Sequence, residues 1–443
     1  MKPNLTVHQE TVLGQILQLL RDGETRIVLK GSAGTGKTFL SSRLSELLLG
    51  LTDLIRTYNN GAVYATAPTN KALAVLQGKI QVPRITFKTI HSACSLYQHI
   101  DAKTGAATFI RARKGKLKGD SFEFSRAAII DESSMLNSDF LGKVKMVDGY
   151  EEYVRGYLED FRFPIIFIGD AKQLNPVGEE VSPVWTKGFK EVELTEIIRQ
   201  GAGNPIIDLS RDLDLIPFKR PALVDGKGYM YSEDRRKFVE DLAAVNGTDE
   251  LKYLAYTNKD VDAMNQVVRE RRYGKPRRIE KEETIVFNTP LGSFYTNQEV
   301  RVDEMEIVTS DIYIPTEKTK YDENNDPYGD MDKIRIKYYV VNNSFKVVHE
   351  LSDTLYTSIY KTLKANNREL GWDGRGYHYF ANQFADIKYN HGLTIHKSQG
   401  STYKTAIVNI GNIMWNRNAV ERQRMLYTAI TRASDLVILN NVR

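Results

Sequence analysis

The chain has a single cysteine, Cys94, among its 443 residues. One cysteine cannot form an intramolecular disulfide bond or a cysteine-based metal site, and its rarity fits a reducing compartment. The chain also lacks any run approaching about 18 apolar residues, the length that a membrane-spanning helix needs. Polar side chains occur throughout its first segment, which is unlike the apolar core of a secretion signal. These absences predict a soluble, cytoplasmic protein that does not bind a membrane.

A strong excess of charge of one sign is missing as well. The 61 lysines and arginines exceed the 56 aspartates and glutamates by only five charges. This balance permits contact with nucleic acid through local basic patches but does not require it. An apolar content of 41% and a charged content of 26% are ordinary for a globular protein. The length favours about three domains.

The most specific pattern present is a glycine-rich loop between a predicted strand, 26–30, and a predicted helix, 39–49. Backbone N–H groups of such a loop surround phosphate oxygens, Lys37 can reach the β- and γ-phosphates, and the Thr38 hydroxyl can hold Mg²⁺. The loop therefore predicts a nucleotide-phosphate site. Its residues match G-x-x-x-x-G-K-[ST] without mismatch and are Gly31, Ser32, Ala33, Gly34, Thr35, Gly36, Lys37 and Thr38.

Further strands end in polar residues, and helical patterns alternate with them. The strand at 62–67 ends before Pro68 and Thr69, and the strand at 127–130 ends before Asp131 and Glu132. This alternation predicts a parallel sheet, whose ligands collect at the carboxyl ends of its strands. An Asp-Glu pair at a strand end is common by itself. Together with the phosphate loop, it predicts Mg²⁺ binding by Asp131 and activation of a water molecule by Glu132.

A third such strand, 164–168, precedes Gln173, which could sense a γ-phosphate as a hydrogen-bond donor. A second α/β region begins with a strand at 251–255 and a helix, and it resumes with the strand at 405–410, the helix at 420–432 and the strand at 436–439. Because strands and helices alternate in both regions, the sequence predicts an α/β fold with two parallel sheets.

Between these parts, residues 281–389 predict antiparallel strands at 284–287, 299–302 and 334–341, an acidic loop at 321–332, and a helix at 349–367. The aromatic residues Tyr377, Tyr379 and Phe380 suit either core packing or base stacking.

Several residues have two readings from the local pattern alone. Residues 97–124 predict a small β-hairpin, and its basic run, 111–118, suits either a solvated face or nucleic acid. Gln9 completes a capping box with Thr6 at the start of a helix over 5–22. Arg199, in a predicted helix end or connector at 193–200, reads as a surface residue, and Arg432 reads as a partner of a helix dipole.

In order and spacing, these motifs resemble those of superfamily 1 DNA helicases, in the RecD-like group and closest to the Dda type of T-even phages. The similarity spans nearly the whole chain, from the Gln9 helix to the last strand. It implies two RecA-like motor domains, at 1–190 and at 191–280 plus 386–443. The first domain would carry a β-hairpin pin at about 97–124. The second would carry a β-rich insertion at 281–385, SH3-like with a tower-like extension.

The resemblance also implies that ATP and Mg²⁺ bind between the motor domains. Gln9 would read the adenine edge, and Thr38 and Asp131 would hold the metal. Arg199 and Arg432 would reach the γ-phosphate from the second domain. This role replaces the local interpretations of Arg199 as a surface residue and of Arg432 as a partner of a helix dipole. The implied catalytic residues are Lys37, Glu132, Gln173, Arg199 and Arg432. The implied cofactor-binding residues are Gln9, Gly31, Ser32, Ala33, Gly34, Thr35, Gly36, Lys37, Thr38, Asp131, Gln173, Arg199, Gly400 and Arg432.

A single DNA strand is the implied polymer substrate. Phe109 is a candidate for base stacking in the pin, and the other residues would contact phosphates and sugars. The candidate DNA-binding residues are Pro68, Thr69, His91, Phe109, Asn258, Thr394 and His396.

The expected function is that of a monomeric, ATP-dependent DNA helicase. It would move 5′-to-3′ on single-stranded DNA and unwind forks in phage-type replication or recombination, in the host cytoplasm. A single-strand binding protein or another replication protein is a candidate partner. Two alternatives stay open: a single-strand translocase or RNA helicase that does not unwind DNA, and a nucleotide-gated binding protein. Glu132 and Arg432 favour a motor, because a pure clamp could lose either.

Overall fold

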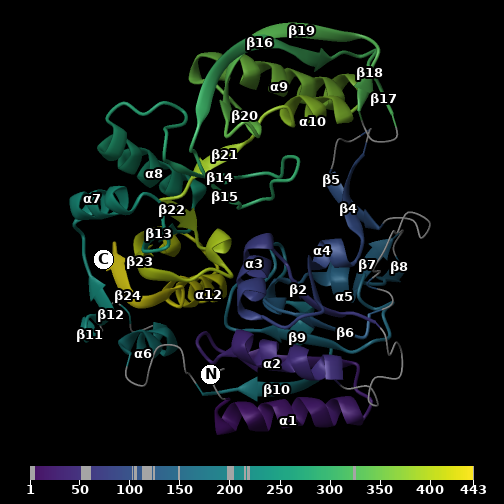
Figure 1. Cartoon of the computed structure of the whole chain (residues 1–443), viewed down its shortest axis with the longest axis vertical. Helices are drawn as coiled ribbons and strands as arrows, with labels where there is room; N and C mark the ends of the chain where they lie inside the picture. The colour runs from purple at the N-terminus through teal and green to yellow at the C-terminus, as the bar shows by residue number, and fades with distance from the viewer. Residues whose placement is uncertain are drawn as a thin grey trace.

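The computed structural model describes residues 5–442, except for 51–60, 102, 104–106, 112–121, 123–124, 148–149, 197–203, 214–215, 217–219 and 323–325. In this part of the chain, two six-stranded sheets lie side by side below a set of smaller sheets and helices (Figure 1). None of the helices described combines the length and apolar character that crossing a bilayer requires.

The first sheet is wholly parallel and has the strand order β10-β1-β9-β6-β2-β3. Its strands are β1 (Arg26–Gly31), β2 (Val63–Ala67), β3 (Ile85–Thr89), β6 (Ala127–Ile130), β9 (Ile165–Gly169) and β10 (Lys190–Leu194). Its helices are α1 (Val7–Arg21), α2 (Lys37–Gly50), α3 (Asn70–Lys79), α4 (Ile90–Ala93) and α5 (Ser138–Leu141).

Both faces of this sheet are buried, because alternate residues of each strand point to opposite sides. In β1, Ile27 and Leu29 pack with α1 and α2, whereas Val28 packs on the other side. The second side also buries Ile90 of α4 and Phe140 of α5. The carboxyl ends of the strands are left to carry polar residues.

The second sheet has the order β11-β12-β24-β23-β13-β22 and is parallel except for β11. Helices α6, α11 and α12 pack on one face, and α7 and α8 pack on the other. Its strands are β11 (Ala222–Val224), β12 (Lys227–Tyr231), β13 (Leu251–Ala255), β22 (Gly392–Thr394), β23 (Tyr403–Asn409) and β24 (Ala433–Asn440). Its helices are α6 (Pro205–Arg211), α7 (Arg235–Val245), α8 (Asn258–Tyr273), α11 (Ile410–Met414) and α12 (Ala419–Ile430).

The upper segment, residues 284–389, contains a three-stranded sheet β15-β14-β21, a second three-stranded sheet β16-β19-β20 and a short β17-β18 ladder. The inner face of β16 and β19 packs on two helices, α9 and α10. The strands are β14 (Thr284–Phe287), β15 (Glu299–Arg301), β16 (Met305–Pro315), β17 (Lys320–Tyr321), β18 (Pro327–Tyr328), β19 (Met331–Val341), β20 (Phe345–Val348) and β21 (Ile387–Tyr389). The helices are α9 (Glu350–Leu370) and α10 (Arg375–Ala381).

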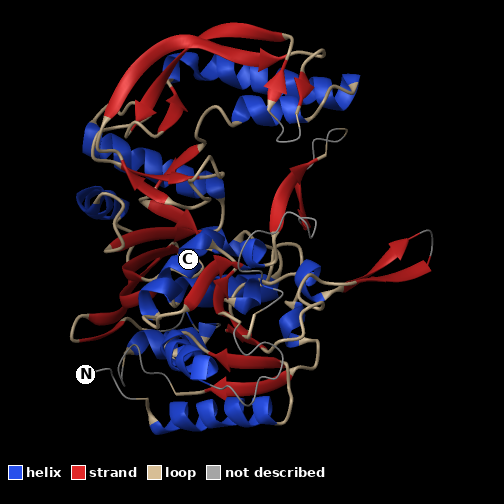
Figure 2. Ribbon diagram, turned by 45° about the vertical axis from the view of Figure 1, so that its right-hand side comes forward, coloured by secondary structure: helices blue, strands red, loops and turns tan. Residues whose placement is uncertain are grey.

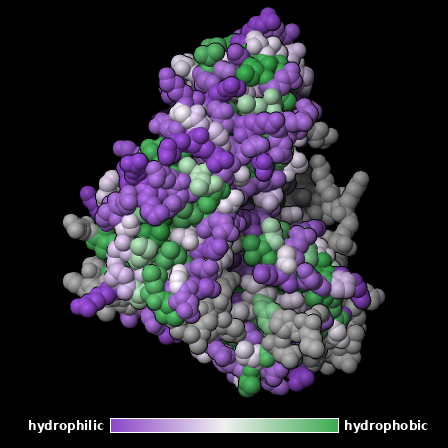
Figure 3. Space-filling view, turned by 60° about the vertical axis from the view of Figure 1, so that its left-hand side comes forward, coloured by the Kyte–Doolittle hydropathy of each residue, from purple (hydrophilic) through white to green (hydrophobic). Residues whose placement is uncertain are grey.

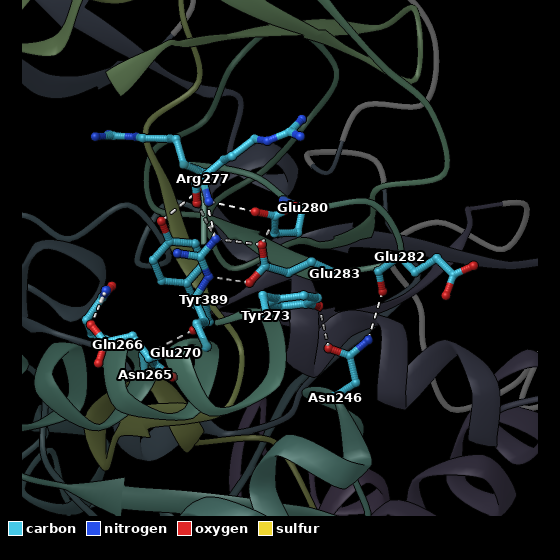
Figure 4. A network of polar contacts seen from close by, with 12 residues as sticks. Asn246, Asn265, Gln266, Glu270, Tyr273, Arg277, Glu280, Glu282, Glu283 and Tyr389 are labelled. Atoms are coloured by element: carbon cyan, nitrogen blue, oxygen red, sulfur yellow. Dashed lines mark hydrogen bonds and ion pairs between the residues drawn. The ribbon is translucent and has the colours of Figure 1, made fainter. Parts of the chain in front are cut away.

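A buried ion pair lies at the junction between α8 and the start of the upper segment, and its acidic partner is Glu283, which directly precedes β14 (Figure 4). Arg269 of α8 donates from Nη2 to Glu283 at 3.0 Å, and the two side chains are 2% and 0% exposed. The Arg269 guanidinium also lies 3.8 Å from the ring centroid of Tyr389 in β21. Both charges are paired in the interior, so removing either partner would leave the other buried and unpaired at this junction.

Two hairpins extend from the first sheet region (Figure 2). One consists of β4 (Leu96–Ile100) and β5 (Ala107–Arg111) and points toward α9 and α10. The other consists of β7 (Lys143–Val147) and β8 (Tyr150–Val154) and projects away from the body. The first lies within the segment 97–124 expected to form a hairpin, although the basic run beyond Arg111 lies outside the described residues. The second was not expected.

Two expected domain boundaries, one expected connector and one expected loop are wrong. A domain boundary at 190 would separate β10 from the first sheet, with which it pairs through β1. The same strand contains Glu193, which was expected in a helix end or connector. A boundary at 385 would separate β21 from β14, its antiparallel partner. The acidic loop expected at 321–332 contains β18 and the start of β19. Strand pairing across long sequence separations decides these limits, and local composition does not reveal it.

The aromatic residues of α10 differ in how deeply their side chains are buried. Tyr377 and Phe380 belong to the core beneath β16 and β19, which favours the packing interpretation for these two. Figure 3 shows the side of the whole molecule that lies on the left in Figure 1, and this face is mainly polar, with separate apolar patches.

Candidate nucleotide cleft and nucleic-acid surface

The glycine-rich loop connects β1 to α2, as its motif requires. Gly34 and Gly36 have φ angles of 85° and 81°, a region that side chains other than glycine rarely adopt. A Cβ atom at Gly31 would lie 2.6 Å from the Thr35 hydroxyl oxygen. The Lys37 ammonium donates to the carbonyl oxygens of Gly31 at 2.7 Å and Ser32 at 3.0 Å. The lysine head is therefore held directly over the loop.

Gln9 forms the capping box that its position suggested and also contacts the phosphate loop. Its side-chain oxygen accepts the backbone N–H of Thr6 at 3.1 Å, and its own backbone N–H donates to the Thr6 hydroxyl, which completes the capping box. Its amide nitrogen donates to the carbonyl of Thr35 in the loop at 3.5 Å. The side chain is only 2% exposed. Gln9 thus links the first helix to the edge of the phosphate loop.

Asp131 and Glu132 follow β6 at the carboxyl edge of the first sheet. The Asp131 carboxylate accepts the backbone N–H of Glu132 at 2.9 Å. Glu132 has a φ of 50°, the left-handed conformation, which is uncommon outside glycine and costs free energy. Both side chains line the cleft described next. Carboxylate and hydroxyl oxygens suit Mg²⁺, so Asp131 and Thr38 fit that ion.

A cleft of about 270 Å³ lies between the two sheets. Three larger cavities, of about 730, 600 and 520 Å³, lie elsewhere and contain none of the phosphate-loop residues. The second sheet contributes Arg432, which donates to the carbonyls of Ser401 at 3.1 Å and Thr428 at 3.3 Å. Arg199 lies outside the described residues. Predicted site residues that line the cleft are Ala33, Gly34, Gly36, Lys37, Thr38, Asp131, Glu132, Gln173, Gly400 and Arg432.

Glycine is required at position 400 because the two halves of the cleft approach closely there. Its φ is 76°, and a Cβ atom would lie 3.0 Å from the side chain of Ala72 in α3. The segment after β22 and helix α3 therefore approach closely at this point, with little room for a side chain.

The loop after β9, which contains Gln173, is held largely by the second sheet's helix α12. Arg424 donates to the carbonyls of Ala171 at 2.7 Å and Gln173 at 2.8 Å. The Thr428 hydroxyl accepts the N–H of Leu174 at 3.3 Å. The Gln173 side chain is 2% exposed, and its oxygen has no hydrogen-bond partner among the described residues. This loop is thus fastened to the opposite half of the molecule.

Tyr427 of α12 completes that connection. Its hydroxyl donates to Asp170 at 2.7 Å and accepts the N–H of Ala33 at 3.1 Å. Burial and the neighbouring Asp170 carboxylate raise the pKa of the Tyr427 hydroxyl above its usual range, so it stays protonated. Sequence reasoning assigned Tyr427 and Arg424 no role, although Tyr427 lies in the segment that ends at Arg432.

The candidate DNA-binding residues follow strands at the carboxyl edges of both sheets. Pro68 and Thr69 follow β2, and the Thr69 hydroxyl caps α3 by accepting the N–H of Ala72 at 3.2 Å. His91 follows β3 and lies 4.6 Å, between ring centroids, from Phe109 of β5. Phe109 is half exposed, and burial lowers the pKa of His91. These four residues connect the first sheet's edge to its upward-pointing hairpin.

The second group follows β13 and β22. Asn258 begins α8, and its side-chain oxygen accepts from Lys388 at 3.4 Å. Thr394 is buried, and its hydroxyl accepts the N–H of Lys397 at 3.4 Å. His396 packs near Tyr256 and lies 3.8 Å from a Glu421 carboxylate. Burial lowers the pKa of His396, and Glu421 opposes that shift. Each group is therefore assembled on its own sheet.

Comparison with known proteins identifies two domain types. An AAA domain model matches residues 4–214, and a model of the UvrD-like helicase C-terminal domain matches residues 391–440. The chain is 27% identical over 471 residues to the ATP-dependent DNA helicase Dda of Enterobacteria phage T4, covering 97% of each chain. It is 26% identical over 504 residues to the uncharacterized protein R530 of Acanthamoeba polyphaga mimivirus, covering 96% of this chain and 98% of that one.

Among solved structures, the Pif1 helicase of Candida albicans is similar at 18% identity and a TM-score of 0.47, covering 99% of this chain and 94% of that one. The two domain models fall on the two sheets that form the cleft, and the similarity to Dda runs from end to end. The chain therefore contains an AAA domain and a UvrD-like helicase C-terminal domain, and over nearly its whole length it is similar to the Dda helicase.

Proposed function

We propose that this chain is an ATP-dependent DNA helicase that moves along single-stranded DNA and unwinds duplex DNA. The observation that carries this proposal is the cleft where Lys37, Glu132 and Gln173 of one sheet face Gly400 and Arg432 of the other. A site divided between two bodies can open and close with the state of its nucleotide. The similarity to Dda, an ATP-dependent DNA helicase, supports ATP and DNA as the substrates.

In the proposed reaction, a water oxygen bonds to the γ-phosphorus of ATP while the bond to the bridging β–γ oxygen breaks. Glu132 takes the proton of the attacking water, and Lys37 contacts the β- and γ-phosphates. Thr38 and Asp131 would hold Mg²⁺, which neutralises charge on the phosphates. Arg432, together with Arg199, stabilises the charge on the transferred phosphoryl group, and Gln173 donates to it. Gln9 contacts the adenine edge.

The loop holding Gln173 links this chemistry to motion. Its backbone is bound by Arg424 and Thr428, while Asp170 and Ala33 are bound by Tyr427. Loss of the γ-phosphate removes contacts that favour the closed cleft, so the two halves separate. Alternating grip by the two groups of strand-contacting residues then moves the protein along DNA.

The motor domains in this proposal are 5–194 and 204–280 plus 390–442, with the upper segment as an SH3-like insertion and tower. The β4/β5 hairpin acts as the pin that separates the strands, with Phe109 stacking on a base. Asn367 of α9 donates to the carbonyl of Lys103 near the hairpin tip at 3.3 Å, which supports a pin braced by the upper segment. The resemblance favours 5′-to-3′ movement, a monomer, and a role in phage-type replication or recombination in the cytoplasm.

The proposal is tested by comparing the unwinding of two DNA substrates, one with only a 5′ tail and the other with only a 3′ tail. Unwinding that needs ATP and the 5′ tail is expected, and a requirement for the 3′ tail would overturn the polarity. The Glu132→Gln variant should bind ATP and single-stranded DNA while hydrolysis and unwinding nearly vanish. Unwinding that persists in this variant would rule out the motor mechanism. DNA-stimulated hydrolysis without strand separation would instead favour a translocase.

A further inference from the structure

A cavity of about 730 Å³ lies at the carboxyl edge of the second sheet, between α11, α12 and two residues that follow α6, Leu213 and Ile216. Its lining residues are all different from those of the nucleotide cleft. The volume falls in the range of small-ligand pockets, about 300–1,000 Å³. None of the nucleotide or strand-contacting residues assigned above lines it.

The cavity adjoins the segment expected to contact the DNA strand. Asn412, which lines the cavity, accepts the backbone N–H groups of Tyr256 and Thr257, each at 2.9 Å. These residues directly precede Asn258. Asp260, one position after Lys259, also lines the cavity. A strand held at Asn258 would therefore pass beside the opening.

An exposed tryptophan stands at this cavity. Trp415 is 71% exposed, and its neighbour Met414 is 47% exposed, although tryptophan is usually largely buried. The cavity also contacts the buried apolar residues Ile410 and Leu426. The site thus combines an accessible aromatic ring with an apolar interior.

Polar and charged groups surround this apolar surface. Gln423 and Asn441 place amide groups at the cavity, and the Asn441 amide nitrogen donates to the Asn409 side chain at 3.0 Å. Arg422 supplies a cation whose Nη1 donates to the Asn416 carbonyl at 2.8 Å. Lys259 and Arg417 are exposed nearby in the chain. The Asp260 carboxylate accepts from the Asn409 amide at 3.1 Å and from the Tyr253 hydroxyl, which offsets part of its charge. Arg422 at the cavity, next to an exposed aromatic ring, favours an anion that carries flat rings.

We infer that this cavity receives a base of single-stranded DNA next to the nucleotides held at Asn258, with the base stacked on Trp415. The inference rests on the proposed function, because it extends the path of the same strand. Stacking tolerates any base, and amides of the glutamine and asparagine type can contact different base edges. The site therefore strengthens the grip on the strand without selecting a sequence. Arg422 and Arg417 would contact the flanking phosphates.

Intrinsic fluorescence provides a direct test, because the chain has three tryptophans and Trp415 can be removed singly. The full chain is titrated with oligothymidylates of about 4 to 16 nucleotides, the range of single-strand site sizes. The wild type, Trp415→Phe and Trp415→Ala are compared. Leu351→Ala, at a site 77% exposed on α9, is the matched control for loss of an exposed apolar side chain.

Quenching of wild-type emission is expected, with most of it absent in Trp415→Phe. Trp415→Ala should weaken binding of the longer oligonucleotides about tenfold, as expected for one lost stacked base, and the deficit should shrink for the shortest ones. Trp415→Phe should retain most of the affinity, and Leu351→Ala should match the wild type.

Equal quenching in the wild type and Trp415→Phe, or wild-type affinity of Trp415→Ala at every length, would overturn the base site and leave this face to a protein partner. Failure of the proposed function has a different signature, since wild-type ATP hydrolysis would then not respond to DNA of any length.

Discussion

The Tyr427 hydroxyl donates to the Asp170 carboxylate at 2.7 Å and joins two halves of the molecule that are separated by most of the sequence. Tyr427 lies on α12, which packs on the second sheet, whereas Asp170 follows a central strand of the first. The same oxygen accepts the N–H of Ala33 in the phosphate loop. One buried hydroxyl therefore contacts both the loop that surrounds phosphate and the loop that carries Gln173.

Replacing Tyr427 with phenylalanine should uncouple these loops. Asp170 and the Ala33 N–H lose a partner, at a cost of about 1.5–3 kcal/mol for a hydrogen bond to a charged group. We expect DNA-stimulated kcat to fall about tenfold or more, with KM for ATP changing far less. Steady-state ATPase assays measure both constants. Tyr150→Phe, at a site 78% exposed on β8, is the matched control, and an unchanged kcat in Tyr427→Phe would contradict the coupling.

Replacing Arg432 with alanine should abolish DNA-stimulated hydrolysis. Arginine contacts to a transferred phosphoryl group accelerate such reactions by about 10³-fold or more. Nucleotide affinity, measured by equilibrium binding, should change far less because the phosphate loop remains. Arg432→Lys should not restore turnover, since lysine lacks the planar fork of donors. Normal turnover in the alanine variant would remove Arg432 from the reaction.

Phe109 should matter more for unwinding than for hydrolysis. Its ring packs on His91 and is half exposed on the β4/β5 hairpin. We expect Phe109→Ala to slow fork unwinding about tenfold, the effect of one lost stacking contact, and Phe109→Trp to restore it. Fork unwinding and single-strand-stimulated ATPase are measured together. Tyr97→Ala, on the opposite face of the same hairpin, is the control, and equal losses in both variants would argue against a specific stacking role.

The buried pair of Arg269 and Glu283 should be costly to break from one side. Glu283→Gln or Arg269→Met leaves a buried charge without its partner, and each should lower the free energy of unfolding by about 3–5 kcal/mol. Urea denaturation followed by circular dichroism measures this change. The double variant Arg269→Met/Glu283→Leu should recover much of the loss. A small effect in both single variants would mean that water reaches this junction.

His391 should make the protein less stable in mild acid. Burial, assisted by the nearby Lys252, lowers the pKa of His391 to about 3. Between the unfolded pKa, about 6.5, and the folded value, only the unfolded chain takes up this proton, so stability falls by up to about 1.4 kcal/mol per pH unit below 6.5. Denaturation of His391→Leu at pH 7.5 and 5.5 should show a smaller acid loss than the wild type. His99→Gln, at an exposed histidine, should retain the wild-type loss.

Local patterns predicted the nucleotide side of the site well. The phosphate loop, Asp131 and Glu132 each follow a short apolar strand, and strands, loops and helices of this kind are specified by nearby residues. The expected parallel sheets are present for the same reason. The placements of Gly400 and Arg432 beside the loop came only through family resemblance, since nothing near them in sequence indicates a cleft.

Apart from the placements implied by the family resemblance, contacts between distant segments were not predicted. The edge strand β10 and the projecting β7/β8 hairpin depend on pairing partners, and short strands carry a weak local signal. Trp415 and Tyr427 illustrate the same limit, because the Trp415 side chain is exposed and the Tyr427 side chain is buried, although the two residues lie close together in one helical part of the chain. The spacing of apolar residues in the sequence cannot distinguish an exposed aromatic side chain from a buried one.

The sequence by itself determined the phosphate loop and its carboxylate partners, because a few consecutive residues dictate that backbone and chemistry. Only the tertiary structure decided that Arg432 faces this loop, that Tyr427 bridges Asp170 and Ala33, and that Trp415 opens onto a cavity beside Asn258. These relationships depend on how two separately folded sheets meet. Their packing is set by side chains hundreds of residues apart, whose combined effect no local pattern contains.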